Sequence, residues 1–146
     1  MATVIRPEIS QKNKYWISKH RYYELKHFCL QYPEWKQVYS KLCDENLPLS
    51  MIETISADNF PSDPATKRDL IKAFYSERIK LIEINALEAD PCLHDYIIKG
   101  VTEGRSYTYL NTVMDIPCGK DMYYDRYRKF FWLLSESRER DNYGLK

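Results

Sequence analysis

Apolar residues recur at intervals of three and four along most of this chain, the spacing that gathers them on one face of an α-helix. The first such segment covers residues 19–30, and Ser18 precedes it with a side chain suited to capping a helix N-terminus. Its recurring apolar positions are Tyr22, Leu25, Phe28 and Cys29. The pattern predicts an amphipathic helix that buries this face.

Proline positions indicate where the next two helices begin and end. Pro33 suits the first turn of a second helix, because the N–H that proline lacks would have no helical acceptor there. The inner side of this helix is predicted to carry Trp35, Val38, Tyr39 and Leu42. Asp63-Pro64 is a start signal for a long helix over 65–89, which Asp90-Pro91 ends.

The last block of the chain holds three helical segments in quick succession. A helix over 93–103 is predicted to stop at Gly104, and Ser106 is expected to cap a short helix after it. The short helix carries Tyr107, Leu110, Val113 and Met114 on its apolar side. A turn at 115–119 then leads to a final helix from near Lys120 to about Leu134. This helix is predicted to bury Tyr123, Tyr127, Phe130, Phe131 and Leu134.

These elements predict an all-α fold, a helical bundle with a C-terminal helix-turn-helix. Glycine is scarce, with 4 residues, and strand-like alternation between tight turns is hard to find. We expect an N-terminal helical module at 1–62, basic and rich in aromatic residues, and a module with the long helix and the helix-turn-helix at 63–146. Residues 1–13 form a polar lead-in, and 44–63 form a connector with a short helical turn at 50–55.

Charge is unevenly distributed although the formal net charge is only +1. Residues 12–41 carry seven Lys/Arg against two Glu, a balance of +5, whereas residues 51–100 carry six basic against nine acidic groups, a balance of −3. This asymmetry predicts one basic and one acidic face. No apolar run approaches the ~20 residues that span a bilayer, and the first residues lack a signal-peptide pattern. We therefore expect a cytoplasmic protein without a membrane partner.

No residue pattern points to catalysis, a cofactor or a metal. The four cysteines, none of them in a CxxC pair, are Cys29, Cys43, Cys92 and Cys118. We expect reduced, mostly buried thiols, because structural metal sites use closely spaced ligand pairs. The three histidines are scattered, and there is no HExxH, GxSxG or phosphate-binding loop. The sequence therefore predicts a protein that is not an enzyme.

The outward side of the final helix is the candidate nucleic-acid interface. At ~100° per residue, the side opposite the aromatic stripe presents polar and charged groups. The candidate DNA-binding residues are Lys120, Asp121, Tyr124, Asp125, Arg128 and Lys129. Arg128 and Lys129 suit guanine edges or phosphates, while Tyr124 and Asp125 could contact base edges. The alternative is an ordinary solvated helix face.

A second basic segment lies near the N-terminus. There, cationic and aromatic side chains alternate, a mixture that can hold phosphates and stack on exposed bases. The candidate residues for this second nucleic-acid or partner contact are Lys14, Trp16, Lys19, Arg21 and Tyr22. The alternative is that the aromatic rings belong to the core and the lysines only solubilise it.

The C-terminal half of the chain also resembles a known family. The resemblance is carried by residues 99–134, KGVTEGRSYTYLNTVMDIPCGKDMYYDRYRKFFWLL, and by the preceding helix at 78–97, RIKLIEINALEADPCLHDYI. These segments resemble RinA/ArpU-type phage transcriptional regulators, which in turn look like region four of bacterial sigma factors. The matching features are EGRSY at 103–107, Ile116 in the turn and YYDRYRKFFWLL in the final helix.

The resemblance implies a phage or prophage regulator that acts in the bacterial host, commonly on late or packaging genes, by binding promoter-proximal double-stranded DNA. It places Lys120, Asp121, Tyr124, Asp125 and Arg128 toward the groove. A homodimer could form through the long helix. A second hypothesis is a protein-interaction factor that binds host RNA polymerase or another host protein, which fits the near-neutral charge. A third is a small DNA-packaging subunit.

Overall fold

The computed structural model describes residues 13–44 and 63–142, and within these ranges it contains helices and no strand. The predicted all-α class is confirmed. The predicted helical turn at 50–55 and all but the last residue of the lead-in at 1–13 lie outside the described residues. None of the described helices is both long and apolar enough to cross a membrane.

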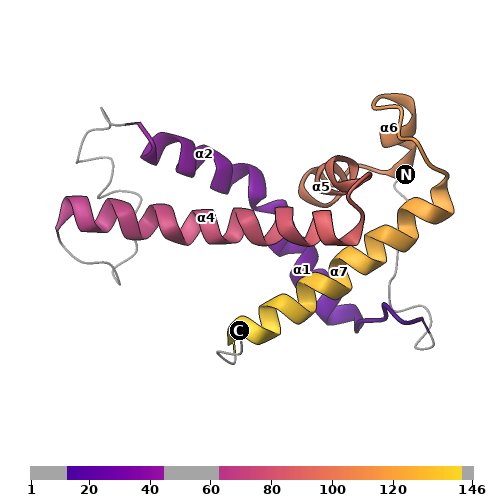
Figure 1. Cartoon of the computed structure of the whole chain (residues 1–146), viewed down its shortest axis with the longest axis horizontal. Coiled ribbons are helices and arrows are strands. Elements are labelled where there is room, and N and C mark those ends of the chain that lie inside the picture. Colours follow the sequence, from indigo (N-terminus) through magenta and orange to yellow (C-terminus); the bar gives the residue numbers. More distant parts are fainter. Residues whose placement is uncertain (1–12, 45–62, 143–146) are drawn as a thin grey trace. The chain divides into compact units, whose positions relative to one another are not determined.

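The helices follow the predicted order closely. They are α1 (Lys19–Leu30), α2 (Tyr32–Leu42), α4 (Pro64–Ala89), α5 (His94–Glu103), α6 (Tyr107–Thr112) and α7 (Lys120–Asn142) (Figure 1). The largest difference concerns α7, which ends at Asn142 rather than near Leu134. The residues beyond Leu134 are rich in Glu and Arg, residue types that favour helix even without an apolar stripe.

Side chains and backbone geometry close the helix ends as expected. The Oγ atom of Ser18 accepts a hydrogen bond from the backbone N–H of Arg21 at 3.3 Å, which confirms the N-cap of α1. Asp63 caps α4 in the same way, and the hydrogen bonds from Thr66 lower the pKa of its carboxyl. Gly104 ends α5 with φ of 67°, a left-handed conformation that glycine adopts without strain.

The described residues pack as two compact units. One unit contains residues 13–31 and 81–142, and the other contains 32–44 and 63–80. This grouping differs from the predicted boundary between 62 and 63, because α1 contacts α5 and α7 instead of forming a module with α2. The cause is the buried face of α1, whose Tyr22 ring lies 5.1 Å from that of Phe131 on α7.

The core of the first unit is largely aromatic. The rings of Tyr127 and Phe131 lie 4.9 Å apart, and those of Phe130 and Phe131 lie 5.1 Å apart, both edge to face. The largest fully buried side chains of this unit are Tyr22, Leu25, Ile82, Ile97, Leu110, Tyr123, Phe130, Phe131 and Leu134. The prediction that α7 is buried through its tyrosine and phenylalanine side is confirmed.

The second unit consists of α2 and the first part of α4. Leu42 and Ile71 are each 1 % exposed, and Val38 and Tyr75 pack against them. Arg68 on α4 donates to the backbone carbonyls of Leu42, at 3.0 Å, and Asp44. Since the last carbonyls of a helix lack partners inside it, this side chain completes the C-terminal end of α2.

Two predictions need correction. The short helix was expected to carry Val113 and Met114, but α6 ends at Thr112, and Val113 is its C-cap and is 62 % exposed. The thiols are not mostly buried: Cys29 is buried, Cys118 is half-buried, and Cys43 and Cys92 are exposed. Burial raises the pKa of the Cys29 thiol far above its usual value.

Candidate nucleic-acid interface

The loop between α6 and α7 is fixed by contacts at both ends. The phenol of Tyr107 donates to the carbonyl of Cys118 at 2.7 Å, and the backbone N–H of Ile116 donates to the carbonyl of Leu110 at 3.1 Å. The side chain of Ile116 is buried. Because α6 also packs with α5, the start of α7 is held in a defined position relative to both helices.

Tyr124 is not on the outward face, and this part of the predicted interface is wrong. Its side chain is 7 % exposed, and its hydroxyl accepts a hydrogen bond from the backbone N–H of Tyr107 at 3.3 Å. Its ring also lies 5.0 Å from that of Tyr123. Tyr124 precedes Tyr127 and Phe131 by three and seven positions, the spacing of one helix face, so it belongs to the buried aromatic side of α7.

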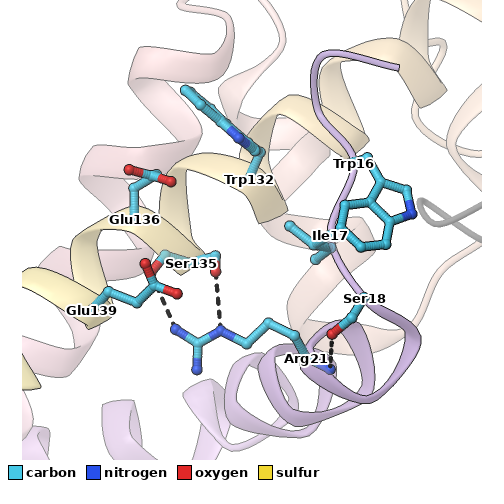
Figure 2. Close-up of a pocket in the computed structure, with 8 residues that line it drawn as sticks. All are labelled: Trp16, Ile17, Ser18, Arg21, Trp132, Ser135, Glu136 and Glu139. Carbon is cyan, nitrogen blue, oxygen red and sulfur yellow. Dashed lines mark hydrogen bonds between the residues drawn. The ribbon is translucent and has the colours of Figure 1, made fainter. Parts of the chain in front are cut away.

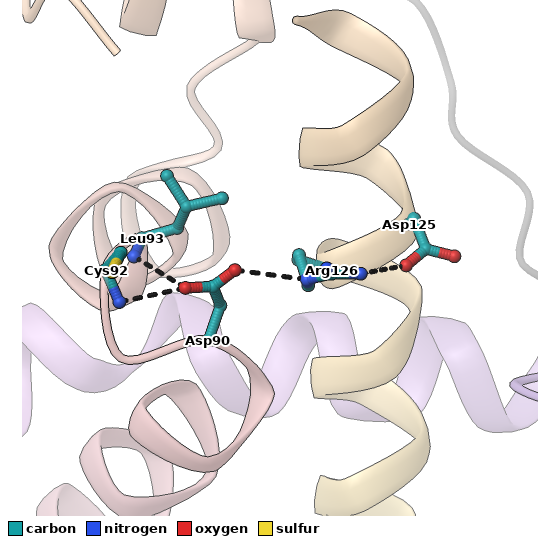
Figure 3. A network of polar contacts seen from close by, with 5 residues as sticks. All are labelled: Asp90, Cys92, Leu93, Asp125 and Arg126. Carbon is teal, nitrogen blue, oxygen red and sulfur yellow. Dashed lines mark hydrogen bonds and ion pairs between the residues drawn. The ribbon is translucent and has the colours of Figure 1, made fainter. Parts of the chain in front are cut away.

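An ion-pair network holds the middle of α7 (Figure 3). Arg126 donates through Nε to Asp90 Oδ2 at 3.1 Å, and Asp90 Oδ1 accepts from the backbone N–H groups of Cys92 and Leu93. The hydrogen bond to Asp90 raises the pKa of the Arg126 guanidinium. Arg126 also pairs with Asp125. The Asp125 carboxylate is therefore held by its neighbour instead of projecting freely as a base-edge acceptor.

The other predicted DNA contacts keep access to solvent. Lys120 and Asp121 are exposed in the first turn of α7, and Arg128 and Lys129 are half-buried two turns further on. Within the described part of the chain, none of these four side chains has an ion-pair partner. Three cations and one aspartate of the predicted interface thus keep access to solvent along this part of α7.

The N-terminal candidate residues are not all available for an outside contact. Tyr22 is 2 % exposed and its hydroxyl bonds to that of Tyr127 at 2.8 Å, so it belongs to the core and cannot stack on a base. Arg21 is engaged by Ser135 on α7. Lys14 and Lys19 remain exposed, and Trp16 is half-buried.

The structure reveals a pocket that the sequence did not indicate. It joins the segment before α1 with the C-terminal half of α7 and has a volume of about 510 Å³ (Figure 2). Its lining residues are Trp16, Ile17, Ser18, Arg21, Trp132, Ser135, Glu136 and Glu139. The two parts stand more than a hundred residues apart, as the 114-residue separation of Arg21 and Ser135 shows, so no local pattern could have found it.

The described residues give no sign of a metal centre, since no three His, Cys, Asp or Glu side chains among them gather in a way that could hold an ion. Comparisons with protein-family models, with curated proteins and with solved structures found no match to this chain. A functional interpretation therefore depends on the geometry and charge of α5, α6 and α7.

Proposed function

We propose that this chain is a DNA-binding transcriptional regulator of phage or prophage origin, in which α5, α6 and α7 act as a helix-turn-helix. One observation carries the proposal. The aromatic side of α7 is anchored in the core while Lys120 and Asp121 in its first turn stay exposed, so this end of the helix is free to approach a groove.

The charges on α7 suit a phosphate backbone. The N-terminal end of a helix carries partial positive charge, and Lys120 adds a full charge at that end. Arg128 and Lys129 would then meet phosphates or guanine edges further along the groove. Asp121 works against nonspecific binding, because its carboxylate approaches the same phosphates. The interface in this proposal no longer includes Tyr124, and Asp125 serves only to hold Arg126.

The resemblance of residues 99–134 to RinA/ArpU-type regulators adds a biological role to the proposal. It suggests control of late or packaging genes in a bacterial host. The corrected interface fits this use, because a few exposed cations on a rigidly seated helix can position a protein on duplex DNA before base contacts add specificity.

The test selects bound fragments from random duplex DNA and then measures their affinity by fluorescence anisotropy at several salt concentrations. We expect Arg128→Ala to weaken binding by ~1–3 kcal/mol if the side chain reads a base. Lys120→Ala should weaken all sequences alike and reduce the salt slope by about one. Sedimentation of the complex determines whether one chain or a homodimer binds.

Lys80→Ala on α4 is the matched control, because this lysine is exposed and lies outside the candidate interface. It should leave DNA affinity unchanged. If Lys120→Ala and Arg128→Ala remain folded by circular dichroism and bind the selected DNA as tightly as the parent chain, the groove assignment is wrong. Asp121→Asn should strengthen nonspecific DNA binding, because it removes a negative charge near the phosphates. Weaker nonspecific binding would contradict the proposed approach to phosphates.

A further inference from the structure

The pocket between the segment before α1 and the C-terminal half of α7 has the size and lining of a ligand site. Its volume of about 510 Å³ lies within the ~300–1,000 Å³ typical of ligand pockets. In Figure 2, Glu136 and Glu139 lie on one side of it and Trp16 and Ile17 on the other, with Arg21 along its base. Both carboxylates come from one face of α7, because they stand three positions apart in the sequence.

The cation inside the pocket is already used by the fold. Arg21 donates through Nε to Ser135 Oγ at 3.0 Å and through Nη2 to the carbonyl of Ser135 at 3.1 Å, and its Nη1 pairs with Glu24. All three nitrogens of the guanidinium therefore have acceptors. Arg21 shapes the base of the pocket and is not arranged to receive an anionic ligand.

The two carboxylates of the pocket differ from Arg21 in this respect. Within the described ranges, Glu136 and Glu139 have no ion-pair partner. The indole rings of Trp16 and Trp132 line the same pocket. The faces of indole rings carry negative potential and attract cations, most strongly when carboxylates add their charge. A neutral apolar ligand would instead bury the carboxylates without compensation.

We propose that this pocket binds an arginine or lysine side chain from a basic segment of a partner protein. The pocket is open to solvent, so a side chain of a peptide can enter it from outside. The methylene stem of such a side chain would pack on the indoles, and its charged end would reach the two carboxylates. This function is separate from DNA binding, because Glu139 lies about 15 Å beyond Lys129 at helical rise.

The experiment measures binding of a blocked peptide with two arginines by isothermal titration calorimetry. A peptide of the same length with citrulline in place of arginine keeps the shape and removes the charge. We expect the citrulline peptide to bind roughly tenfold or more weakly, and the double variant Glu136→Gln/Glu139→Gln to weaken the arginine peptide by a similar factor, the usual scale for a lost charge-assisted contact. Glu88→Gln, an exposed carboxylate on α4, should change nothing.

Three results would overturn the proposal. Equal binding of the arginine and citrulline peptides to the unmodified chain would show that charge is not recognised. Unchanged affinity in the folded double glutamine variant would place any peptide site elsewhere. If methylguanidinium bound as tightly as the arginine peptide, counted per cation, the pocket would be a site for free small cations. The DNA affinity of the double variant is measured as well and should equal that of the parent chain. This measurement distinguishes a failure of the peptide-binding proposal from a failure of the DNA-binding proposal.

Discussion

Gly100 provides a sharp test of the packing between α5 and α7. It lies inside α5, and a Cβ atom at this position would stand 2.1 Å from the hydroxyl oxygen of Tyr123. Tyr123 is 1 % exposed, so its ring has no open space to move into. The next nearest atom of that ring, Cζ, would be 3.4 Å from the added methyl, which is an ordinary contact. The hydroxyl alone therefore determines whether alanine fits.

The expected free energies follow from two opposing effects. Replacing glycine by alanine within a helix stabilises a protein by roughly 0.5–1 kcal/mol, whereas overpacking a core costs about 1–3 kcal/mol. We expect Gly100→Ala to destabilise the chain by about 1–2 kcal/mol. The Tyr123 hydroxyl is buried and has no hydrogen-bond partner among the described residues. Tyr123→Phe should therefore be neutral or stabilising, because it removes a desolvated polar group.

The effect of Gly100→Ala on the free energy of unfolding should change sign when Tyr123 is replaced by phenylalanine. In the Tyr123→Phe background, Gly100→Ala should stabilise the chain by roughly 0.5–1 kcal/mol, because only the helix propensity remains. Urea unfolding of the four proteins, followed by circular dichroism, gives the coupling free energy, which should be about 1.5–3 kcal/mol. A coupling below about 0.5 kcal/mol, the usual scatter for independent sites, would refute the contact between this hydroxyl and Gly100.

Three further predictions concern the polar and buried groups that surround the same helices. Asp90→Asn should cost about 1 kcal/mol and Asp90→Ala about 2 kcal/mol in urea unfolding, because asparagine keeps an acceptor for the backbone N–H groups, whereas alanine removes that acceptor together with the contact to Arg126. Equal losses would contradict this division. Burial raises the pKa of Tyr123 and Tyr127 above the ordinary 10.0, so their contribution to stability is complete below pH ~10 and is lost as the pH rises further. In an alkaline titration their tyrosinate absorbance should appear together with the loss of helical circular dichroism, and ionisation of all tyrosines before unfolding would disprove their burial. Ser106→Ala should destabilise the chain by about 1 kcal/mol through loss of the N-cap of α6, with Ser106→Thr as the retaining control.

The sequence by itself determined the local features of this protein. Helix starts at Ser18, Asp63 and Ser106 and the stop at Gly104 were predictable, because a cap depends on the chemistry of a residue and its immediate neighbours. The buried side of α7 was predictable for a similar reason, since the helical period alone gathers its aromatic residues.

Only the tertiary structure decided which surfaces stay open. Tyr124 lies at the edge of the aromatic stripe and is buried where the first residue of α6 bonds to its hydroxyl, and Tyr22 looks like a basic-aromatic contact but belongs to the core. The pocket joins Trp16 with Glu136, and α1 packs with α7 across most of the chain. Periodicity fixes the direction of a side chain relative to its own helix, whereas exposure depends on neighbours that come from distant parts of the sequence.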